Sequence, residues 1–335
     1  MPDASTQTAP LRKKLIKTPA PPAPPTIVET QTSQGLGLTR RPIGETTKKK
    51  YDQAIKRIRD AGLNMGNDED DDVRDVIAWI KSKGGDSAQK VYLSAIKYEL
   101  GKLDKPNYFP RQYQKEIDRL YGKQNEKDEE QELTEKQTSN FVPYDELLAV
   151  QHRLAAKEDK TDRDWKNLLV ASLYTLNPPV RADYGSVQVF KKRRQGRTGN
   201  ELVWGQKDGS YFVMRDYKTK GTYGNVEIRV SPELAAVIDA WFTHLGKIPK
   251  FLLGRAITSN ALLGEIQDAF RSTKKDIGVN LLRHAYITDF FKQPRSIKEK
   301  EQLADMMLHS RDRQEKYAVL SQFNIATFNA ATQTS

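Results

Sequence analysis

The chain has 335 residues, of which 55 are Lys or Arg and 44 are Asp or Glu, so its net charge is +11. This length predicts about two domains with extensions, and the basic balance indicates an anionic partner, with nucleic acid as the first choice. Cysteine is absent from the sequence, which excludes disulfides, thiolate zinc sites and a cysteine nucleophile. The four histidines lack metal-binding spacing, no apolar run approaches the length of a membrane span, and the first residues lack the apolar core of a secretory signal. We therefore expect an intracellular protein that uses no metal or other cofactor.

Residues 1–45 are rich in Pro, Thr, Ala and Gln, with "TPAPPAPPT" at 18–26. Such a composition cannot bury enough apolar surface to offset the entropy of ordering, so it predicts a disordered tail. The tail carries the basic stretch "LRKKLIK" at 11–17. A solvated tail, a nuclear-import signal and an arm that contacts DNA are all consistent with this stretch.

Residues 46–121 predict a compact helical domain, because apolar residues recur there at helical spacing. We expect Asp86 or Ser87 to cap the third helix and Val91 to lie on its buried face. The three predicted helices span 46–63, 67–85 and 86–103. Basic residues gather near the start of this domain and predict a cationic face that contacts DNA: Lys48, Lys49, Lys50, Lys56 and Arg57.

A charged stretch separates this domain from a larger one. Residues 122–140, "GKQNEKDEEQELTEKQTSN", have almost no apolar side chains and predict a solvated linker. Residues 141–325 predict a domain that is mainly α with a small antiparallel β-sheet, an α+β fold, followed by a tail at 326–335. The predicted strands are 186–190, 210–217 and 225–230, and the predicted helices are 144–157, 162–176, 231–245, 261–275, 280–292 and 296–310.

Most of the net charge lies in residues 141–335, which contain 30 Lys or Arg residues and 22 Asp or Glu residues. The densest basic stretch is "KKRRQGR" at 191–197. We expect it to be a solvated hairpin loop that touches the DNA backbone, and such contacts position a protein without reading sequence. The residues concerned are Lys191, Lys192, Arg193 and Arg194.

Four stretches of the larger domain carry residue types that suit a phosphate. "LYTLNPPVRADY" places an arginine just past a helix, and "RDYKTKGTYG" places two lysines at a turn between strands. "NLLRHAYIT" places an arginine on a helix with an asparagine one turn earlier, and "MLHSRDRQEKYAV" supplies a histidine and a tyrosine. The candidate catalytic residues are Arg181, Lys218 or Lys220, Asn280, Arg283, His309 and Tyr317.

Each of these residues has an ordinary structural interpretation when it is taken alone. Arg181 would cap the preceding helix, Lys218 would be a turn lysine, and Tyr317 would be a packed aromatic. Arg283 and its neighbour His284 would lie on a solvated helix face. Their occurrence together, in this order and on a basic domain, favours a shared site.

Together the four stretches resemble the tyrosine recombinase (integrase) family of phage-integrase-like enzymes over most of the larger domain. That family has an Arg after a helix, a Lys on a β-hairpin, an H-x-x-R helix, and then "GHS" with a Tyr eight or nine residues later. Here "LHS" is followed by Tyr317 eight residues after His309. The wording of "PPVRADY" and "LLRHAYIT" is most similar to integrases of DNA viruses and of mobile elements of eukaryotes. The helical region 47–121 is similar to the family's SAM-like core-binding domain.

The sequence departs from the family pattern at two positions. Asn280 stands where the family has the His of H-x-x-R; it cannot take a proton as His does, but it can donate a hydrogen bond to a phosphate oxygen. Leu308 stands where the family has the Gly before "HS", which puts the local backbone in question. The family's lysine corresponds to Lys218 or Lys220, and we favour Lys218 because "YKT" resembles the "KT" of the family's hairpin.

The resemblance implies phosphoryl transfer without a metal, and the residue types suit that chemistry. Two arginines can grip the non-bridging phosphate oxygens, and His309 adds a further donor. A phenol is mostly protonated at neutral pH, and nearby cations favour the phenolate. Attack by Tyr317 would give a covalent 3′-phosphotyrosine ester, and the hairpin lysine would protonate the leaving 5′ oxygen. These motifs do not offer the clustered carboxylates that two-metal nucleases need.

The resemblance further implies an integrase that clamps duplex DNA between its two domains and integrates or excises a viral or mobile genome. A homotetramer on two DNA sites would follow if the apolar residues near the C-terminus pack on a neighbouring protomer: Leu320, Phe323, Ile325 and Phe328. A host nucleus and a viral factory in the cytoplasm both stay open as locations. Two other functions also stay open. One is DNA relaxation of the type IB topoisomerase kind, and the other is DNA binding by an inert relative, which Asn280 keeps open.

Overall fold

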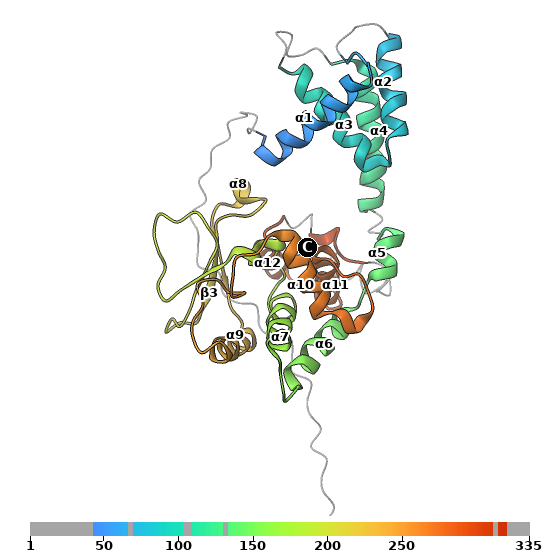
Figure 1. Cartoon of the computed structure of the whole chain (residues 1–335). Helices are drawn as coiled ribbons and strands as arrows, with labels where there is room; N and C mark the ends of the chain where they lie inside the picture. Colours follow the sequence, from blue (N-terminus) through green and yellow to red (C-terminus); the bar gives the residue numbers. More distant parts are fainter. Residues whose placement is uncertain (1–42, 66–69, 103–108, 130–132, 311–313, 320–335) are drawn as a thin grey trace, which may run out of the picture. The chain divides into compact units, whose positions relative to one another are not determined.

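The chain forms two compact units, one ending at Thr134 and the other beginning at Glu135. Each unit has its own hydrophobic core. Two predicted features lie outside the described residues. They are the two tails, except for residues 43–45, and the apolar residues Leu320, Phe323, Ile325 and Phe328. The computed structural model describes residues 43–65, 70–102, 109–129, 133–310 and 314–319 (Figure 1).

The first unit is a helical bundle in which α3 packs against α1, α2 and α4. Apolar residues at helical spacing supply one buried face per helix, and these faces meet in a core that includes Ile58, Val76, Ile80, Leu93, Ile96 and Tyr113. The bounds are Glu45–Asp60 for α1, Asp70–Ser82 for α2, Asp86–Leu100 for α3 and Arg111–Glu129 for α4.

The start of α3 differs from the prediction. Gly85 is the N-cap residue and no side chain caps the helix, so neither Asp86 nor Ser87 has that role. Asp86 instead lies in the first turn, where a negative charge interacts favourably with the helix dipole. Val91 is 38% exposed, because the buried face is centred on Leu93 and Ile96.

Helix α4 continues past the predicted end of the first domain. It runs through Gly122 to Glu129, and α5 follows at Glu135–Asn140 without a buried residue. Both stretches lie in 122–140, which was expected to be a solvated linker. Glu, Lys and Gln are strong helix formers, so a helix that begins with an apolar face can extend into a stretch that lacks one.

Helix α7, Asp162–Thr175, lies at the centre of the second unit. Every residue from Leu168 to Thr175 is buried, as expected for a helix enclosed on all sides. Its neighbours in the core are α6, α9 and α10. The other helical elements are α6 (Tyr144–Ala156), η1 (Ala182–Ser186), α8 (Lys220–Tyr223), α9 (Pro232–His244), α10 (Ser259–Ala269), η2 (Arg271–Thr273), α11 (Val279–Phe290) and α12 (Ile297–Met306).

A four-stranded sheet in the order β1-β2-β3-β4 lies to one side of α6, α7, α10 and α11 (Figure 1). Strands β1 and β2 run parallel, whereas β2 with β3 and β3 with β4 run antiparallel. The prediction of a mainly α protein with a small sheet is confirmed, and the sheet is mixed rather than antiparallel. The strands are Gln188–Phe190 (β1), Glu201–Val203 (β2), Tyr211–Met214 (β3) and Val226–Arg229 (β4).

The mixed topology also corrects two predicted connections. Residues 191–200 join β1 to a parallel neighbour, so "KKRRQGR" is not a hairpin loop. The connection from β3 to β4 contains the short helix α8 instead of a plain turn. Within the described part of the chain, no helix has both the length and the apolar character needed to cross a bilayer.

Candidate active site

Arg283 on α11 is the most enclosed of the candidate residues. Its side chain is fully buried, and Nη1 donates to the carbonyls of Pro179 (2.6 Å) and Met307 (3.1 Å). Nη2 lies 3.2 Å from Nδ1 of His309. Burial lowers the pKa of Arg283, and the nearby Tyr317 opposes that shift through its charge and a hydrogen bond. The solvated-face interpretation of Arg283 is therefore wrong, because the side chain ties together three separate stretches of the chain.

Arg181 reaches the same region from the segment between α7 and η1. Its Nη1 donates to the carbonyl of Leu308 at 3.3 Å, and its own carbonyl accepts from the hydroxyl of Tyr174 at 3.1 Å. Helix α7 ends at Thr175 with Leu176 as its C-cap residue. Arg181 thus points to the segment that carries His309 and does not cap α7.

The residues after α12 form a tight helix end that presents His309. Leu308 N–H donates to Asp305 O at 3.0 Å and His309 N–H donates to Ala304 O at 3.1 Å, the bond pair of a Schellman motif. Leu308 occupies the left-handed region with φ of 59°, which costs roughly 1–2 kcal/mol for a non-glycine residue. Its side chain is 1% exposed, and burial of a leucine contributes about 1.5–3 kcal/mol. The conformation that a glycine would favour is therefore compatible with Leu308.

The contact between Arg283 and His309 assigns the histidine tautomer. A guanidinium can only donate hydrogen bonds, so Nδ1 of His309 must accept. The ring proton is then on Nε2, which makes that nitrogen a donor suited to a phosphate oxygen. His309 itself is 2% exposed.

Tyr317 lies among Arg283, His284 and His309. Its ring centroid is 5.3 Å from the guanidinium carbon of Arg283, 4.6 Å from the ring of His284 and 5.7 Å from the ring of His309. The side chain is only partly buried. Tyr317 does pack on its neighbours, but those neighbours are the cationic and imidazole groups expected of a shared site.

Helix α11 also fixes the backbone around Tyr317. Nδ1 of His284 donates to Tyr317 O at 2.7 Å, and Thr288 Oγ1, one turn later on the same face, accepts from Val319 N–H at 3.0 Å. Burial lowers the pKa of His284 to about 4, so its ring is neutral at physiological pH. One helix therefore supplies Arg283 and also anchors the tyrosine.

Both candidate lysines are exposed and flank Thr219 in the chain. The hydroxyl of Thr219 donates to Leu308 O at 2.8 Å, the carbonyl that Arg181 also contacts. Lys218 precedes α8 and Lys220 is its first residue. The lysine-bearing segment is thereby joined to the His309 segment, although the contacts do not separate Lys218 from Lys220.

Asn280 is not drawn into this cluster. It lies in the first turn of α11, three residues before Arg283, and its side chain is exposed. Residues three apart share a helix face, so Asn280 lies on the face of α11 that carries Arg283.

Asp183 is a site residue that the sequence patterns missed. Burial raises the pKa of its carboxyl to about 6, while Arg181 and Arg283 oppose the shift. Its only sequence signal is its place two residues after Arg181. Its backbone carbonyl accepts from Asn200 Nδ2 at 3.4 Å, and the same amide holds Asp216 O at 2.8 Å.

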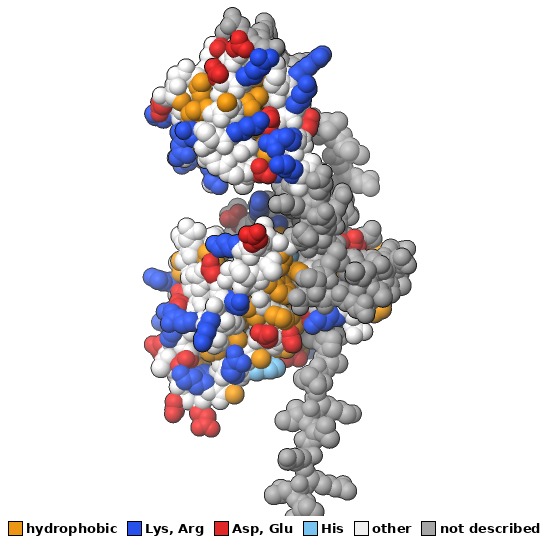
Figure 2. All heavy atoms as spheres, turned by 90° about the vertical axis from the view of Figure 1, so that its right-hand side faces the viewer, with side chains coloured by type: hydrophobic (Ala, Val, Ile, Leu, Met, Phe, Trp, Pro, Cys, Tyr) orange, Lys and Arg blue, Asp and Glu red, His pale blue; other side chains and the backbone are white. Residues whose placement is uncertain are grey.

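The basic stretch after β1 is partly organised by contacts within the unit. Arg193 forms an ion pair with Glu227, whereas the guanidinium groups of Arg194 and Arg197 lie 4.6 and 4.5 Å from the ring centroid of Phe190. Lys191 and Lys192 are exposed. Figure 2 shows Lys and Arg side chains on the visible surface of each unit, with Asp and Glu among them.

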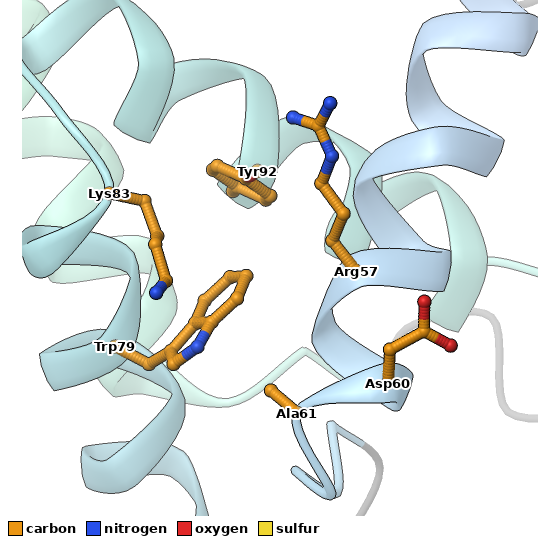
Figure 3. Close-up of a pocket in the computed structure, with 6 residues that line it drawn as sticks. All are labelled: Arg57, Asp60, Ala61, Trp79, Lys83 and Tyr92. Carbon is orange, nitrogen blue, oxygen red and sulfur yellow. The ribbon is translucent and has the colours of Figure 1, made fainter.

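The first unit has a hollow lined by basic and aromatic side chains. Figure 3 shows Arg57 of α1 and Lys83, just after α2, at the sides of a hollow that contains Trp79 and Tyr92. Lys83 Nζ lies 4.8 Å from the ring centroid of Trp79. Lys48, Lys49 and Lys50 are exposed, and Lys56 pairs with Asp60. Asp60 also lines the hollow, and Tyr92 is only 7% exposed.

Comparison with known proteins gives no independent assignment, since no family model and no curated protein matches the chain. Among the described residues, no group of three or more His, Asp or Glu side chains is arranged to hold a metal ion.

Proposed function

We propose that the chain is a DNA strand transferase of the tyrosine recombinase kind, acting as an integrase. It cleaves and rejoins duplex DNA through a covalent 3′-phosphotyrosine ester, and its substrate is a viral or mobile genome. The reaction takes place in the compartment that holds this DNA, either a host nucleus or a viral factory in the cytoplasm. The active form is a homotetramer on two DNA sites.

The observation that carries this proposal is the convergence of three chain segments. They contribute Arg181, Arg283, and the pair His309 and Tyr317, and each of these residues contacts another member of the set or the Leu308 carbonyl. Two guanidinium groups, an imidazole and a phenol form a site with the charge and donors that a phosphodiester transition state needs.

The chemistry follows from these groups. The Tyr317 hydroxyl gives its proton to water, and its oxygen attacks phosphorus while the bond from phosphorus to the 5′ oxygen breaks. Arg181, Arg283 and Nε2 of His309 stabilise the charge on the non-bridging oxygens. Lys218 or Lys220 supplies the proton to the departing 5′ oxygen. Attack by a 5′ hydroxyl on the ester reverses these steps, so rejoining needs no external energy source.

The test is trapping of the covalent intermediate. Nicked duplexes with randomised central sequences are incubated with the wild type in the presence of EDTA, so that cleavage releases a short strand and religation fails. We expect a protein–DNA adduct on a denaturing gel from the wild type and none from Tyr317→Phe. Tyr211→Phe, on β3 and partly exposed, is the matched control and should still form the adduct.

The other outcomes distinguish the alternatives. An adduct from Tyr317→Phe would reject Tyr317 as the nucleophile. Tight DNA binding with no adduct from the wild type would favour an inert DNA-binding protein, the interpretation that Asn280 supports. Adducts accompanied by relaxation of supercoiled DNA, with no exchange of strands between duplexes, would favour the type IB topoisomerase activity.

A further inference from the structure

We propose that Thr219 is a positioning residue, whose hydroxyl holds the lysine-bearing segment against the carbonyl of Leu308 and so places the general acid at the scissile phosphate. This inference rests on the proposed function, because it concerns one step of the same reaction. It assigns a role to Thr219, which lies in the stretch "RDYKTKGTYG" but is not one of the candidate catalytic residues.

The Leu308 carbonyl links three parts of the site, namely the lysine-bearing segment, Arg181 and the segment that carries His309. It accepts from Thr219 Oγ1 at 2.8 Å and from Arg181 Nη1 at 3.3 Å, and a carbonyl oxygen has two lone pairs for two such donors. The residue that follows is His309. The left-handed conformation of Leu308, fixed by the end of α12, determines where this carbonyl points.

Other bonds hold the same segment to Asn200, the residue before β2, and close it on itself. The side-chain amide of Asn200 donates to Asp216 O and accepts from Asp216 N–H, each at 2.8 Å. The hydroxyl of Tyr217 donates to Gly224 O at 2.9 Å. These contacts set the ends of the connection between β3 and β4. The Thr219 hydroxyl extends from that connection to the segment that carries His309.

This bond matters because a lysine side chain is long and flexible. Both candidate lysines are exposed, so their reach depends on where the backbone beside them is held. General acid catalysis contributes about 10²–10⁴-fold to a rate, and only when the acid is within hydrogen-bonding reach of the leaving group. Loss of the Thr219 hydroxyl should therefore remove part of this contribution while Arg181, Arg283 and Tyr317 keep their own contacts.

The experiment compares two leaving groups. Thr219→Val keeps the shape of the side chain and removes the donor. On ordinary nicked DNA we expect its adduct to form about 10–100-fold more slowly than that of the wild type. On DNA with sulfur in place of the bridging 5′ oxygen, the departing thiolate needs no proton, because a thiol is a far stronger acid than an alcohol. Thr219→Val should then react at nearly the wild-type rate.

Four further variants complete the design. Thr219→Ser restores the hydroxyl and should restore the rate on ordinary DNA. Thr243→Val changes an exposed threonine on α9 and should leave both rates unchanged. Of Lys218→Ala and Lys220→Ala, the variant whose defect disappears on the sulfur substrate identifies the acid.

Two results would overturn the inference while the proposed function stands. One is a wild-type rate for Thr219→Val on ordinary DNA. The other is an equal defect on both substrates, which would mean that the hydroxyl supports the site in general and not the acid. An absence of adducts from the wild type on either substrate would instead reject the proposed function, and this inference with it.

Discussion

At the scale of single residues, burial moves the pKa values of two groups beside the arginines in opposite directions. His284 has its pKa lowered to about 4, from a usual value of 6.5, and Asp183 has its pKa raised to about 6, from a usual value of 3.8. Burial disfavours the charged form of each group. The two effects on stability therefore oppose each other over the same acidic range.

For His284 the sign follows from where protons bind. Between about pH 6.5 and pH 4 the unfolded chain binds a proton on this imidazole and the folded chain does not, so the contribution of His284 to stability falls as the pH falls. The full effect is about 3 kcal/mol at most. His284→Gln keeps a donor for the Tyr317 carbonyl and removes the titration. Urea unfolding should show the wild type losing stability relative to His284→Gln on going from neutral to acidic pH.

Asp183→Asn provides the control of opposite sign. The folded chain binds a proton on Asp183 before the unfolded chain does, so the wild type should gain stability relative to Asp183→Asn over the same change. Stability differences that do not vary with pH for either variant would contradict the assigned burial of these groups.

The sequence identified the candidate residues whose side-chain type and motif indicate a role without knowledge of their tertiary contacts. Arg181, Arg283, His309 and Tyr317 belong to short motifs in a fixed order, and the structure brings them together. Thr219 could not be found in this way, because its role depends on the carbonyl of a residue 89 positions away. The roles of Asp183 and His284 could not be predicted either, because they depend on burial and on long-range hydrogen bonds, which a local sequence pattern does not show.

At the scale of elements, the sequence predicted the long helices better than the short strands. The helices of the second unit were found because their apolar periodicity spans several turns. Strand β2 has only three residues and all are buried, so it shows no alternation and the sequence did not predict it. Because β2 runs parallel to β1, the sheet is mixed. The ion pair of its Glu201 with Arg215, 2.7 Å apart and buried, is likewise invisible in a three-residue pattern.

The connection from β1 to β2 carries a prediction about DNA affinity. Arg194 is exposed and its guanidinium lies over the ring of Phe190 at the end of β1, so its charge is accessible to a phosphate. Arg194→Ala should weaken DNA binding about 3–10-fold near 0.1 M salt and reduce the slope of log affinity against log salt by about 0.9. Fluorescence anisotropy across a salt series measures both quantities.

The matched control for this change is Arg271→Ala. Arg271 is exposed on η2 and pairs with Asp268, so its removal changes the net charge equally without altering the basic stretch. Exposed charges are screened beyond about 10 Å at this salt concentration. Equal effects of the two substitutions would indicate a response to net charge alone and would reject a local phosphate contact.

At the scale of the whole molecule, the two separate cores predict two units that fold independently. Fragments 43–129 and 133–335 should each give a helical circular dichroism spectrum and a cooperative unfolding transition. In the full chain, Trp79 is the tryptophan of the first unit, and the other three lie in the second. Fluorescence of Trp79→Phe should therefore follow the second unit and coincide with the transition of fragment 133–335.

A non-cooperative transition in either fragment would contradict this independence. The sequence supported the division into two domains but placed a solvated linker at 122–140, where much of the chain is helical. Composition alone does not distinguish a charged helix from a charged coil, because both are solvated and lack an apolar face.

The complete burial of Arg283 has a kinetic consequence under the proposed chemistry. A phosphate cannot reach a guanidinium that is 0% exposed until its surroundings open. Cleavage then requires an open population, and the apparent affinity for a cleavable site is reduced by the fraction of molecules in that state. Under that chemistry, DNA that favours the open state would be cleaved more often than DNA that leaves it rare. Fidelity would then arise from this gating step, before any bond is broken, in addition to any reading of bases.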